Sequence, residues 1–196
     1  MITQPDSSPA GPAAPGPPQP LVVVSVGTDH HRFDRLVGWM DGWAARHPEV
    51  RVVIQRGGAP DTAHAESAPL IPYDELRDLF ARATAVVSHG GPSTVMDVRC
   101  AGRLPVVVPR DPVHGEHVDG HQIRFSQHLS RHGLATLATT PDELKAAVEA
   151  VLADPDRFAV PASLAELPGV VAFGRAVDDL LGLPALTIGE ARRSGR

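Results

Sequence analysis

Short apolar runs alternate with amphipathic stretches along most of the chain. The apolar runs are rich in valine, as expected of parallel strands that are buried on both faces. The amphipathic stretches repeat apolar residues at intervals of three and four, which is the spacing of one helix face. The predicted strands are Leu21–Val26, Val50–Gln55, Ala85–Ser88, Leu104–Pro109 and Leu134–Leu137. The predicted helices are Phe33–Arg46, Tyr73–Ala83, Ser93–Ala101, Val118–His132 and Pro141–Leu152.

This alternation predicts an α/β fold built on a Rossmann-like, doubly wound parallel sheet. The first helix places Phe33, Leu36 and Met40 on one face, which we expect to pack against the sheet. The last helix has a strong start signal. Proline suits the first helical position, and Asp142 and Glu143 follow it at the positive end of the helix dipole.

Composition changes at both ends of the chain. Residues 5–20 are mainly Pro, Gly, Ala and Ser, which bury too little apolar surface to offset the entropy of ordering. We therefore predict a disordered leader over residues 1–20 and one domain over 21–183, with its motifs in a core at 21–152. A further helix is expected over Val170–Leu181, packed on the flank of the sheet, and residues 184–196 are expected to form a flexible tail.

Composition and charge narrow the classes of partner. The chain has 196 residues, of which 42% are hydrophobic and 21% charged, which is ordinary for a globular domain. A net charge of −5 without a basic cluster argues against a nucleic-acid partner. Cys100 is the single cysteine, so a disulfide within the chain is excluded and a reducing compartment is favoured. The sequence shows no signal peptide and no apolar stretch of roughly 18 residues, so we expect a cytoplasmic protein.

One loop carries the strongest functional signal: SHGGPSTVMD, residues 88–97, between a predicted strand and a predicted helix. Gly90 and Gly91 permit a sharp turn, and the next proline stands where a backbone N–H has no partner in the helix. Ser93 and Thr94 then offer hydroxyl and N–H groups at the positive end of the helix dipole. The loop is a candidate phosphate-binding site, although serine and threonine are also ordinary helix caps.

Three other places in the sequence are further candidates for ligand binding. Asp97 lies one turn into the same helix, where its carboxylate suits the two hydroxyls of a ribose or is an acid on a solvated face. Gly27 and Thr28 follow the first strand, and they offer an anion a close backbone approach and a hydroxyl, or form an ordinary turn. Tyr73 begins a helix, where an aromatic ring lines a pocket for a base or packs as a hydrophobic staple.

The segment PRDPVHGEHVDGHQ, residues 109–122, concentrates histidine and acidic side chains. Such side chains ligate zinc and manganese, but the segment has no HExxH pair and no second cluster to complete a site, so no metal is expected. The same residue types hydrogen-bond a polyhydroxylated ligand, and a solvated polar loop is the plain alternative. The candidate side chains are Arg110, Glu116, His117, Asp119, His121 and Gln122.

Four motifs together resemble glycosyltransferase family 28. In order and spacing, SVGTDHHRFDRLV, YDELRDLFARATAVVSHGGPSTVMDVRCAGRLPVVVPR, HGEHVDGHQ and LSRHG resemble the C-terminal, donor-binding half of that family. The resemblance covers residues 21–152. It is nearest to small stand-alone members, namely the cytosolic catalytic subunit of the dolichol-linked N-acetylglucosamine transferase and bacterial counterparts in exopolysaccharide assembly. It implies a single half-domain of the GT-B fold.

The resemblance implies a role for each motif. Asp97 would hold the ribose, where the related lipid II synthase has the longer Glu, and Tyr73 would contact the uracil. His121 and Gln122 would hold the sugar, with Arg110, Glu116, His117 and Asp119 shaping its pocket. The residues expected to contact the donor diphosphate are Gly27, Thr28, Gly90, Gly91, Ser93 and Thr94.

The resemblance also implies the reaction, which is inverting transfer of a sugar from a nucleoside diphosphate, UDP-linked, to a lipid-linked acceptor without a cofactor. His30 and His31 are candidates for the base. Two-domain relatives bind the acceptor with an N-terminal half, so a membrane-associated partner subunit is expected, which would recruit this chain to the cytoplasmic face of the membrane. The rival predictions are a nucleotide-sugar-binding module without catalysis and a metal-dependent hydrolase that uses the histidines. A 2-epimerase on the same fold is disfavoured, because it too needs a second domain.

Overall fold

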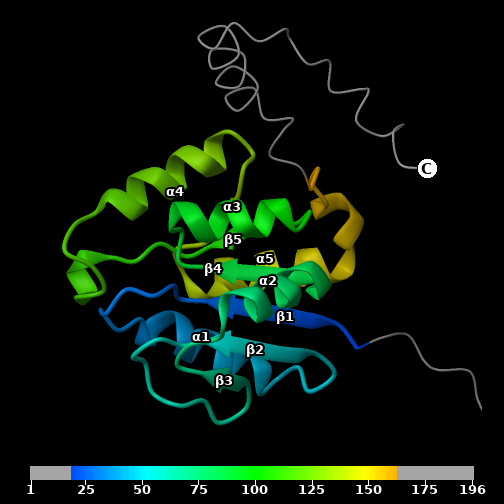
Figure 1. Cartoon of the computed structure of the whole chain (residues 1–196), viewed down its shortest axis with the longest axis horizontal. Coiled ribbons are helices and arrows are strands. Elements are labelled where there is room, and N and C mark those ends of the chain that lie inside the picture. Colours follow the sequence, from blue (N-terminus) through cyan, green and yellow to red (C-terminus); the bar gives the residue numbers. More distant parts are fainter. Residues whose placement is uncertain (1–18, 163–196) are drawn as a thin grey trace, which may run out of the picture.

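A six-stranded sheet, entirely parallel, carries helices on both of its faces (Figure 1). The computed structural model of the chain describes residues 19–162. The expected helix over Val170–Leu181, the tail over 184–196 and all but the last two residues of the expected leader lie outside that range. The strands are β1 (Leu21–Ser25), β2 (Arg51–Gln55), β3 (Glu66–Ala68), β4 (Ala85–Ser88), β5 (Val106–Val107) and β6 (Thr136–Leu137).

The helices divide between the two faces of the sheet. Their bounds are α1 (Asp34–Ala44), α2 (Tyr73–Arg82), α3 (Pro92–Cys100), α4 (His121–Arg131) and α5 (Pro141–Ala153), with 3₁₀ turns η1 (Pro112–His114) and η2 (Pro155–Phe158). Apolar side chains of α1 and α5 pack on one face of the sheet, and those of α2, α3 and α4 pack on the other. The predicted doubly wound, Rossmann-like fold is therefore confirmed.

The core consists of two apolar layers that share the central strand. Every residue of β1 is buried, because neighbouring strands flank it and helices cover both of its faces. Val22 and Val24 face the layer of α1 and α5, whereas Val23 faces Phe80 of α2 in the other layer. Because both faces of β1 are covered, its valines run without alternating polar residues, as is typical of a central strand in a parallel sheet.

In the strand order β3-β2-β1-β4-β5-β6, successive strands are added on one side of β1 up to β3 and on its other side from β4 onwards, so the strand order reverses between β1 and β4. Ser25 and Ser88, the last residues of these two strands, pair in register. The loops that follow them therefore start side by side at the carboxyl edge of the sheet. In open parallel sheets ligands bind at this kind of switch point.

The sequence pattern did not predict β3, because Glu66–Ala68 is a short and mostly polar segment. Distant groups hold this edge strand in place. Asp41 of α1 accepts hydrogen bonds from the backbone N–H groups of residues 63, 64 and 65. Arg51 of β2 donates two hydrogen bonds of 2.8 Å to the carboxylate of Glu66. Since these partners are far apart in sequence, local propensity carries no sign of the strand.

Helix boundaries follow the local capping groups. The prediction that a helix begins at Val118 was wrong, because α4 begins at His121, whose N–H donates to Asp119 over 2.8 Å. The predicted start at Pro141 is confirmed. There Thr140 and Glu143 form a reciprocal capping box, which satisfies backbone N–H groups that the first turn leaves free.

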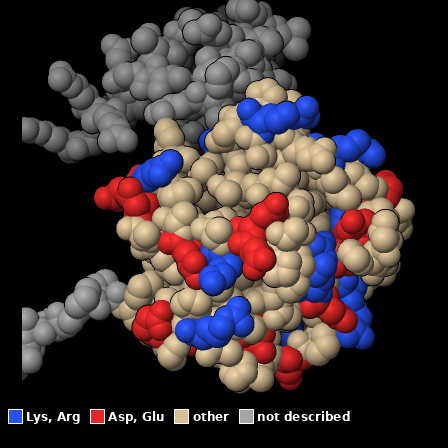
Figure 2. All heavy atoms as spheres, turned by 180° about the vertical axis from the view of Figure 1, so that it is seen from behind, with Lys and Arg blue, Asp and Glu red and all other residues tan. Residues whose placement is uncertain are grey.

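Charges of both signs are mixed on the molecular surface. On the face opposite to that of Figure 1, Lys and Arg lie among Asp and Glu (Figure 2). Phosphate backbones of nucleic acids select a continuous basic surface, which this face does not offer. Within residues 19–162, no helix combines the length and the apolar character that crossing a membrane requires.

Candidate functional site

A cavity of about 440 Å³ opens at the carboxyl ends of β1 and β4. Its walls come from the loop after β1, the segment before α2, and the loop that leads from β4 into α3. It therefore lies at the switch point of the sheet. The lining residues are Ser25, Gly27, Thr28, Gln55, Leu70, Ile71, Pro72, Tyr73, Leu76, Phe80, His89, Gly91, Pro92, Ser93, Thr94 and Asp97.

The floor of the cavity is built from tight backbone turns. Gly27 and Gly90 adopt φ angles of +77° and +82°, a region that side chains disfavour. Pro92 is the first residue of α3, and no side chain caps this end of the helix. The N–H groups of Ser93 and Thr94 in the first turn therefore lack intrahelical acceptors and carry the positive end of the dipole. This arrangement suits an anion at the mouth of α3.

His89 fills the space between the two glycine turns. A Cβ atom on Gly27 would lie 2.5 Å from Cε1 of His89, and a Cβ atom on Gly91 would overlap the same ring. The imidazole is 8% exposed, and its Nδ1 lies 3.4 Å from the carbonyl oxygen of Ser25. The absence of side chains at both glycines is thus a requirement for seating this histidine.

The environment of His89 keeps its ring neutral. Burial, assisted by the positive charge of Arg110, lowers the pKa of His89 to about 4. A neutral imidazole at this point adds no charge of its own and retains one donor and one acceptor nitrogen. His89 lies inside the SHGG segment, where no sequence pattern pointed to a separate role for it. The available signal was a polar residue directly after a buried strand.

Gln55 connects opposite walls of the cavity and was also missed. It is 2% exposed, and its Nε2 donates to the carbonyl oxygen of Gly27 over 3.1 Å. Its Oε1 accepts a hydrogen bond of 3.2 Å from the N–H of Ile71. The amide therefore fixes the turn after β1 relative to the segment before α2. A buried amide at the end of an apolar strand was the sign that could have identified it.

Two predicted nucleoside-binding residues meet at the outer end of the cavity. The hydroxyl of Tyr73, at the start of α2, donates a hydrogen bond of 3.0 Å to Oδ1 of Asp97 on α3. The Tyr73 side chain is 59% exposed, so most of its ring is free for contact. The cavity thus combines free N–H groups at the start of α3 with an aromatic hydroxyl and a carboxylate.

The histidine-rich segment is organised by a buried arginine. Arg110 is fully buried, and it donates to the carbonyl oxygens of Val26, His31 and Glu116 at 2.8, 2.7 and 3.0 Å. Its guanidinium also lies 4.9 Å from the centre of the Phe33 ring. Through these carbonyls the side chain joins the loop after β1 to the loop between β5 and α4. Its expected part in shaping the sugar pocket stays a prediction.

Glu116 has a similar internal role. It is 3% exposed and accepts two hydrogen bonds from Arg35 of α1, at 2.9 and 2.8 Å, and one from the N–H of Asp111. Gln122 is 5% exposed, and its Oε1 accepts from the N–H of Arg110 over 3.4 Å. These contacts hold the loop between β5 and α4 against α1.

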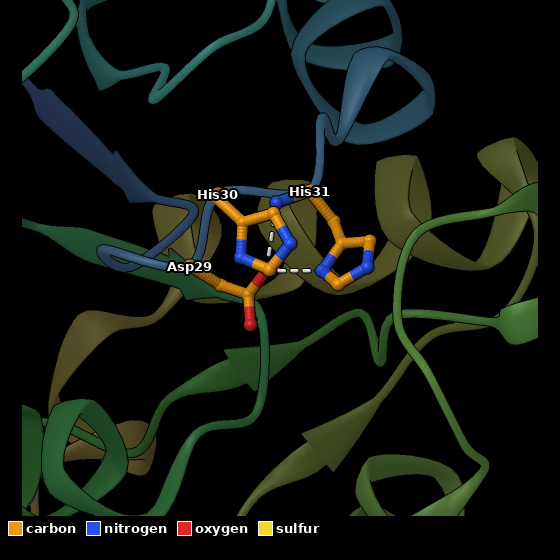
Figure 3. Close-up of side chains that lie close together, drawn as sticks. All are labelled: Asp29, His30 and His31. Carbon is orange, nitrogen blue, oxygen red and sulfur yellow. Dashed lines mark hydrogen bonds and ion pairs between the residues drawn. The ribbon is translucent and has the colours of Figure 1, made fainter.

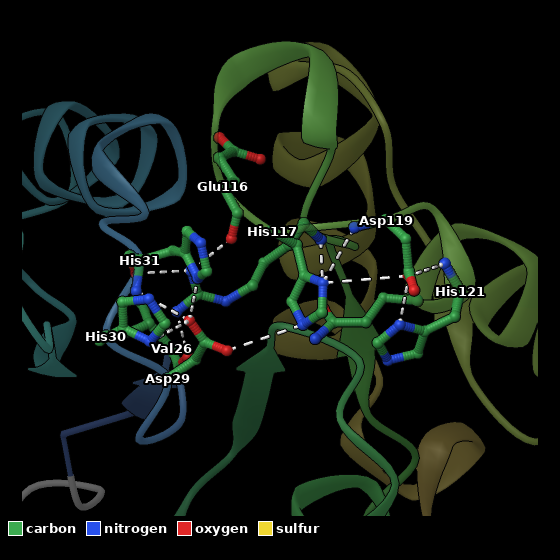
Figure 4. Close-up of polar contacts among 10 residues, drawn as sticks. Val26, Asp29, His30, His31, Glu116, His117, Asp119 and His121 are labelled. Atoms are coloured by element: carbon green, nitrogen blue, oxygen red, sulfur yellow. Dashed lines mark hydrogen bonds and ion pairs between the residues drawn. The ribbon is translucent and has the colours of Figure 1, made fainter.

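Four histidines, His30, His31, His117 and His121, form a polar cluster with Asp29 and Asp119. Asp29 accepts hydrogen bonds from the N–H and Nδ1 of His31, at 2.7 and 2.6 Å, while His30 projects beside them (Figure 3). Asp119 makes the same two contacts with His121, at 2.8 and 2.5 Å. His117 joins the two turns, since its Nε2 lies 3.6 Å from Asp29 (Figure 4).

Asp29 is charged over most of the pH range. Partial burial would raise its pKa, but the hydrogen bonds from His31 and the charge of Arg110 outweigh burial and lower the pKa to about 2. Both carboxylates of the cluster thus have hydrogen-bond donors within their own turns. Among the described residues, two sets have the composition of a metal site, namely Asp29, His30 and His31, and His117, Asp119 and His121.

The structure therefore brings some of the predicted residues together and separates others. Gly27, Thr28, Tyr73, Gly91, Ser93, Thr94 and Asp97 share the cavity. Gly90 supports it from behind, because a Cβ there would press on Ser126 and Val107. Within residues 19–162 the walls of this cavity do not include His30, His31, Arg110, Glu116, His117, Asp119, His121 or Gln122. Contacts of those side chains with a sugar stay predictions.

Comparison with known proteins identifies the family of this domain. The model of the glycosyltransferase family 28 C-terminal domain matches residues 21–168. The chain belongs to glycosyltransferase family 28. The UDP-N-acetylglucosamine--N-acetylmuramyl-(pentapeptide) pyrophosphoryl-undecaprenol N-acetylglucosamine transferase of Ralstonia nicotianae (strain ATCC BAA-1114 / GMI1000) is 32% identical over 102 residues. The match covers 48% of this chain and 26% of that enzyme.

Solved structures share the fold of this family 28 domain. The glycosyltransferase of kitacinnamycin matches with a TM-score of 0.58 and 22% identity, over 87% of this chain and 45% of that one. The calicheamicin glycosyltransferase CalG4 matches with a TM-score of 0.57 and 21% identity, over 86% and 43%. MurG of Acinetobacter baumannii matches with a TM-score of 0.50 and 21% identity, over 74% and 44%. The chain thus corresponds to less than half of each, as expected of a single GT-B half-domain.

Proposed function

We propose that this chain is the donor-binding subunit of an inverting glycosyltransferase, which transfers a sugar from a UDP-linked donor to a lipid-linked acceptor. The observation that carries the proposal is the cavity at the switch point. It combines free N–H groups at the start of α3 with the carboxylate of Asp97 and the ring of Tyr73. A nucleoside diphosphate presents the matching groups in the same order: phosphates, ribose and base.

The proposed chemistry needs a leaving group whose charge is stabilised. An acceptor hydroxyl attacks the anomeric carbon from the face opposite the donor phosphate and gives its proton to a base. The bond between that carbon and the phosphate oxygen breaks, and the nucleoside diphosphate departs with the electron pair. The dipole of α3 and the hydroxyls of Thr28, Ser93 and Thr94 would stabilise the new negative charge. We propose that no cofactor or resident metal takes part.

The acceptor and the base are assigned to a second protein in this proposal. The chain spans less than half the length of the solved structures that it matches, and in those proteins the rest of the chain accompanies this fold. A membrane-associated partner subunit would bind the lipid-linked acceptor and hold this chain at the cytoplasmic face of the membrane. His30 and His31 lie outside the cavity walls, so the partner is the preferred source of the base. The product would belong to exopolysaccharide or glycoconjugate assembly.

Isothermal titration calorimetry with UDP tests the binding half of the proposal. The full chain is expected to bind UDP, and Asp97→Ala is expected to weaken binding at least tenfold, because a charged hydrogen-bond acceptor for ribose is lost. The matched control is Asp74→Ala, an exposed acid on α2 outside the cavity walls. Equal affinity of Asp97→Ala and the unaltered chain would overturn the ribose assignment.

A transfer assay tests the catalytic half. The chain is co-expressed with a membrane subunit from its gene neighbourhood and supplied with a panel of nucleotide sugars and lipid-linked acceptors. Inverted product identifies the transferase, whereas tight donor binding without product in the presence of that partner supports a binding module instead. A hydrolase that uses the histidine cluster would contain stoichiometric zinc or manganese, which mass spectrometry of the purified protein measures.

A further inference from the structure

Tyr73 and Asp97 face each other from different helices at the outer end of the cavity. The hydroxyl oxygen of Tyr73 lies 3.0 Å from Oδ1 of Asp97, and both side chains line the cavity. One turn along α2, the guanidinium of Arg77 lies 5.8 Å from the centre of the Tyr73 ring. Contacts from two sides thus fix the direction of an aromatic side chain that is otherwise largely exposed.

Hydrogen-bond capacity is left over on both partners. A carboxylate has two acceptor oxygens, and the Tyr73 hydroxyl occupies only one position, on Oδ1 of Asp97. The hydroxyl uses its proton in that contact but keeps its own lone pairs as acceptors. The hydrogen bond to Asp97, with the charge of that carboxylate, raises the pKa of Tyr73, so the hydroxyl stays protonated at neutral pH. Two acceptors therefore stand side by side: Oδ2 of Asp97 and the oxygen of Tyr73.

We propose that Tyr73 and Asp97 together clamp the cis-diol of a ribose, each accepting a hydrogen bond from one of its hydroxyls. Tyr73 then determines discrimination against the deoxy analogue that lacks the hydroxyl bound to it, in addition to lying next to the base. The inference rests on the proposed function, because it assumes a nucleoside diphosphate in this cavity. It goes further by dividing the recognition of two sugar hydroxyls between two residues.

Calorimetry with three ligands tests this division: UDP, 2′-deoxy-UDP and 3′-deoxy-UDP. The unaltered chain is expected to bind each deoxy analogue about fivefold or more weakly than UDP, which is the effect of one lost hydrogen bond. Tyr73→Phe is expected to bind UDP about fivefold more weakly than the unaltered chain. It should bind one of the two analogues as tightly as UDP and keep its discrimination against the other.

Two controls separate the possible failures. The melting temperature of Tyr73→Phe is expected to stay unchanged, since the ring is retained and mostly exposed, and Asp97→Asn is expected to weaken discrimination at the hydroxyl that Tyr73→Phe leaves intact. If the unaltered chain binds UDP but Tyr73→Phe matches it with all three ligands, the shared clamp is wrong and the proposed function stands. If the unaltered chain does not bind UDP, both fail.

Discussion

The loop from β4 to α3 and the loop from β5 to α4 leave the same edge of the sheet but use their residues differently. The first, residues 89–91, is made of two glycines and a buried neutral histidine, and it leads into the free N–H groups of Ser93 and Thr94 at the start of α3. The second, residues 108–120, is rich in charge but turns Arg110 and Glu116 inward, onto carbonyl groups and Arg35. The β4–α3 loop, which has few reactive side chains, thus forms the candidate binding surface. The buried charges of the β5–α4 loop, Arg110 and Glu116, instead hold that loop against the rest of the fold.

The largest loss of stability is expected on removal of the buried charge of Arg110. Arg110→Met should lower the free energy of unfolding by about 3 kcal/mol or more, because three buried carbonyl oxygens lose their donors and Glu116 loses a neighbouring charge. Urea denaturation measures the change. Arg124→Met, at an exposed position of α4, is the matched control and should change little. Equal losses in the two variants would show that Arg110 does not hold the loops together.

A somewhat smaller effect is expected from His89, whose burial should make the free energy of unfolding depend on pH. The folded ring has a pKa of about 4, below the 6.5 of a free histidine, so the unfolded chain binds the extra proton first as pH falls. Stability should therefore decline from pH 6.5 towards pH 4, with His89 contributing on the order of 3 kcal/mol. Asp29 acts in a separate window, because its stabilising contribution is lost only as pH falls from 3.8 towards 2.

The contribution of His89 is isolated by His89→Asn, in which the free energy of unfolding should depend less steeply on pH between 6.5 and 4. The control is His128→Asn, on the exposed side of α4. A variant that keeps the full slope would show that other groups titrate in this window and that burial of His89 has no such consequence.

Gly91→Ala tests whether the β4–α3 loop needs a residue without a side chain next to His89. The added methyl overlaps the ring of His89, so stability should fall by about 1–3 kcal/mol and UDP affinity should fall with it. Gly38→Ala is the matched control, since a Cβ there meets nothing within 4 Å and the site is inside α1. That control should gain up to about 1 kcal/mol. Thermal melts and calorimetry compare the pair.

The smallest effect is expected within the charged loop itself. Asp119→Asn should leave the melting temperature unchanged within error, because Asp119 is exposed and bonds only within its own turn. Glu116→Gln, three residues away and buried against Arg35, should lower it clearly. If both substitutions were silent, the division of this loop into buried charges and an exposed turn would be wrong.

Prediction from the sequence worked where a signal was local. Ala85–Ser88 was predicted with the bounds of β4, and the capping box at Thr140 marks the start of α5 where proline and acids indicated it. The edge strand β3 escaped prediction because Asp41 and Arg51, both distant in sequence, stabilise it. The same limit applies to Gln55, whose role depends on meeting Gly27 and Ile71 from separate segments.

Local patterns in the sequence were enough to predict the parallel α/β fold and the position of the candidate anion cradle. Valine runs, glycine turns and Pro92 act through backbone conformation and burial, which neighbouring residues largely dictate. Which polar side chains face the cavity could be seen only in the folded chain. Arg110 and His89 are both polar residues that follow a strand, yet Arg110 joins two loops and His89 packs between two glycine turns. Their roles depend on the partners available in space, because a buried polar group must find its hydrogen bonds wherever the fold supplies them.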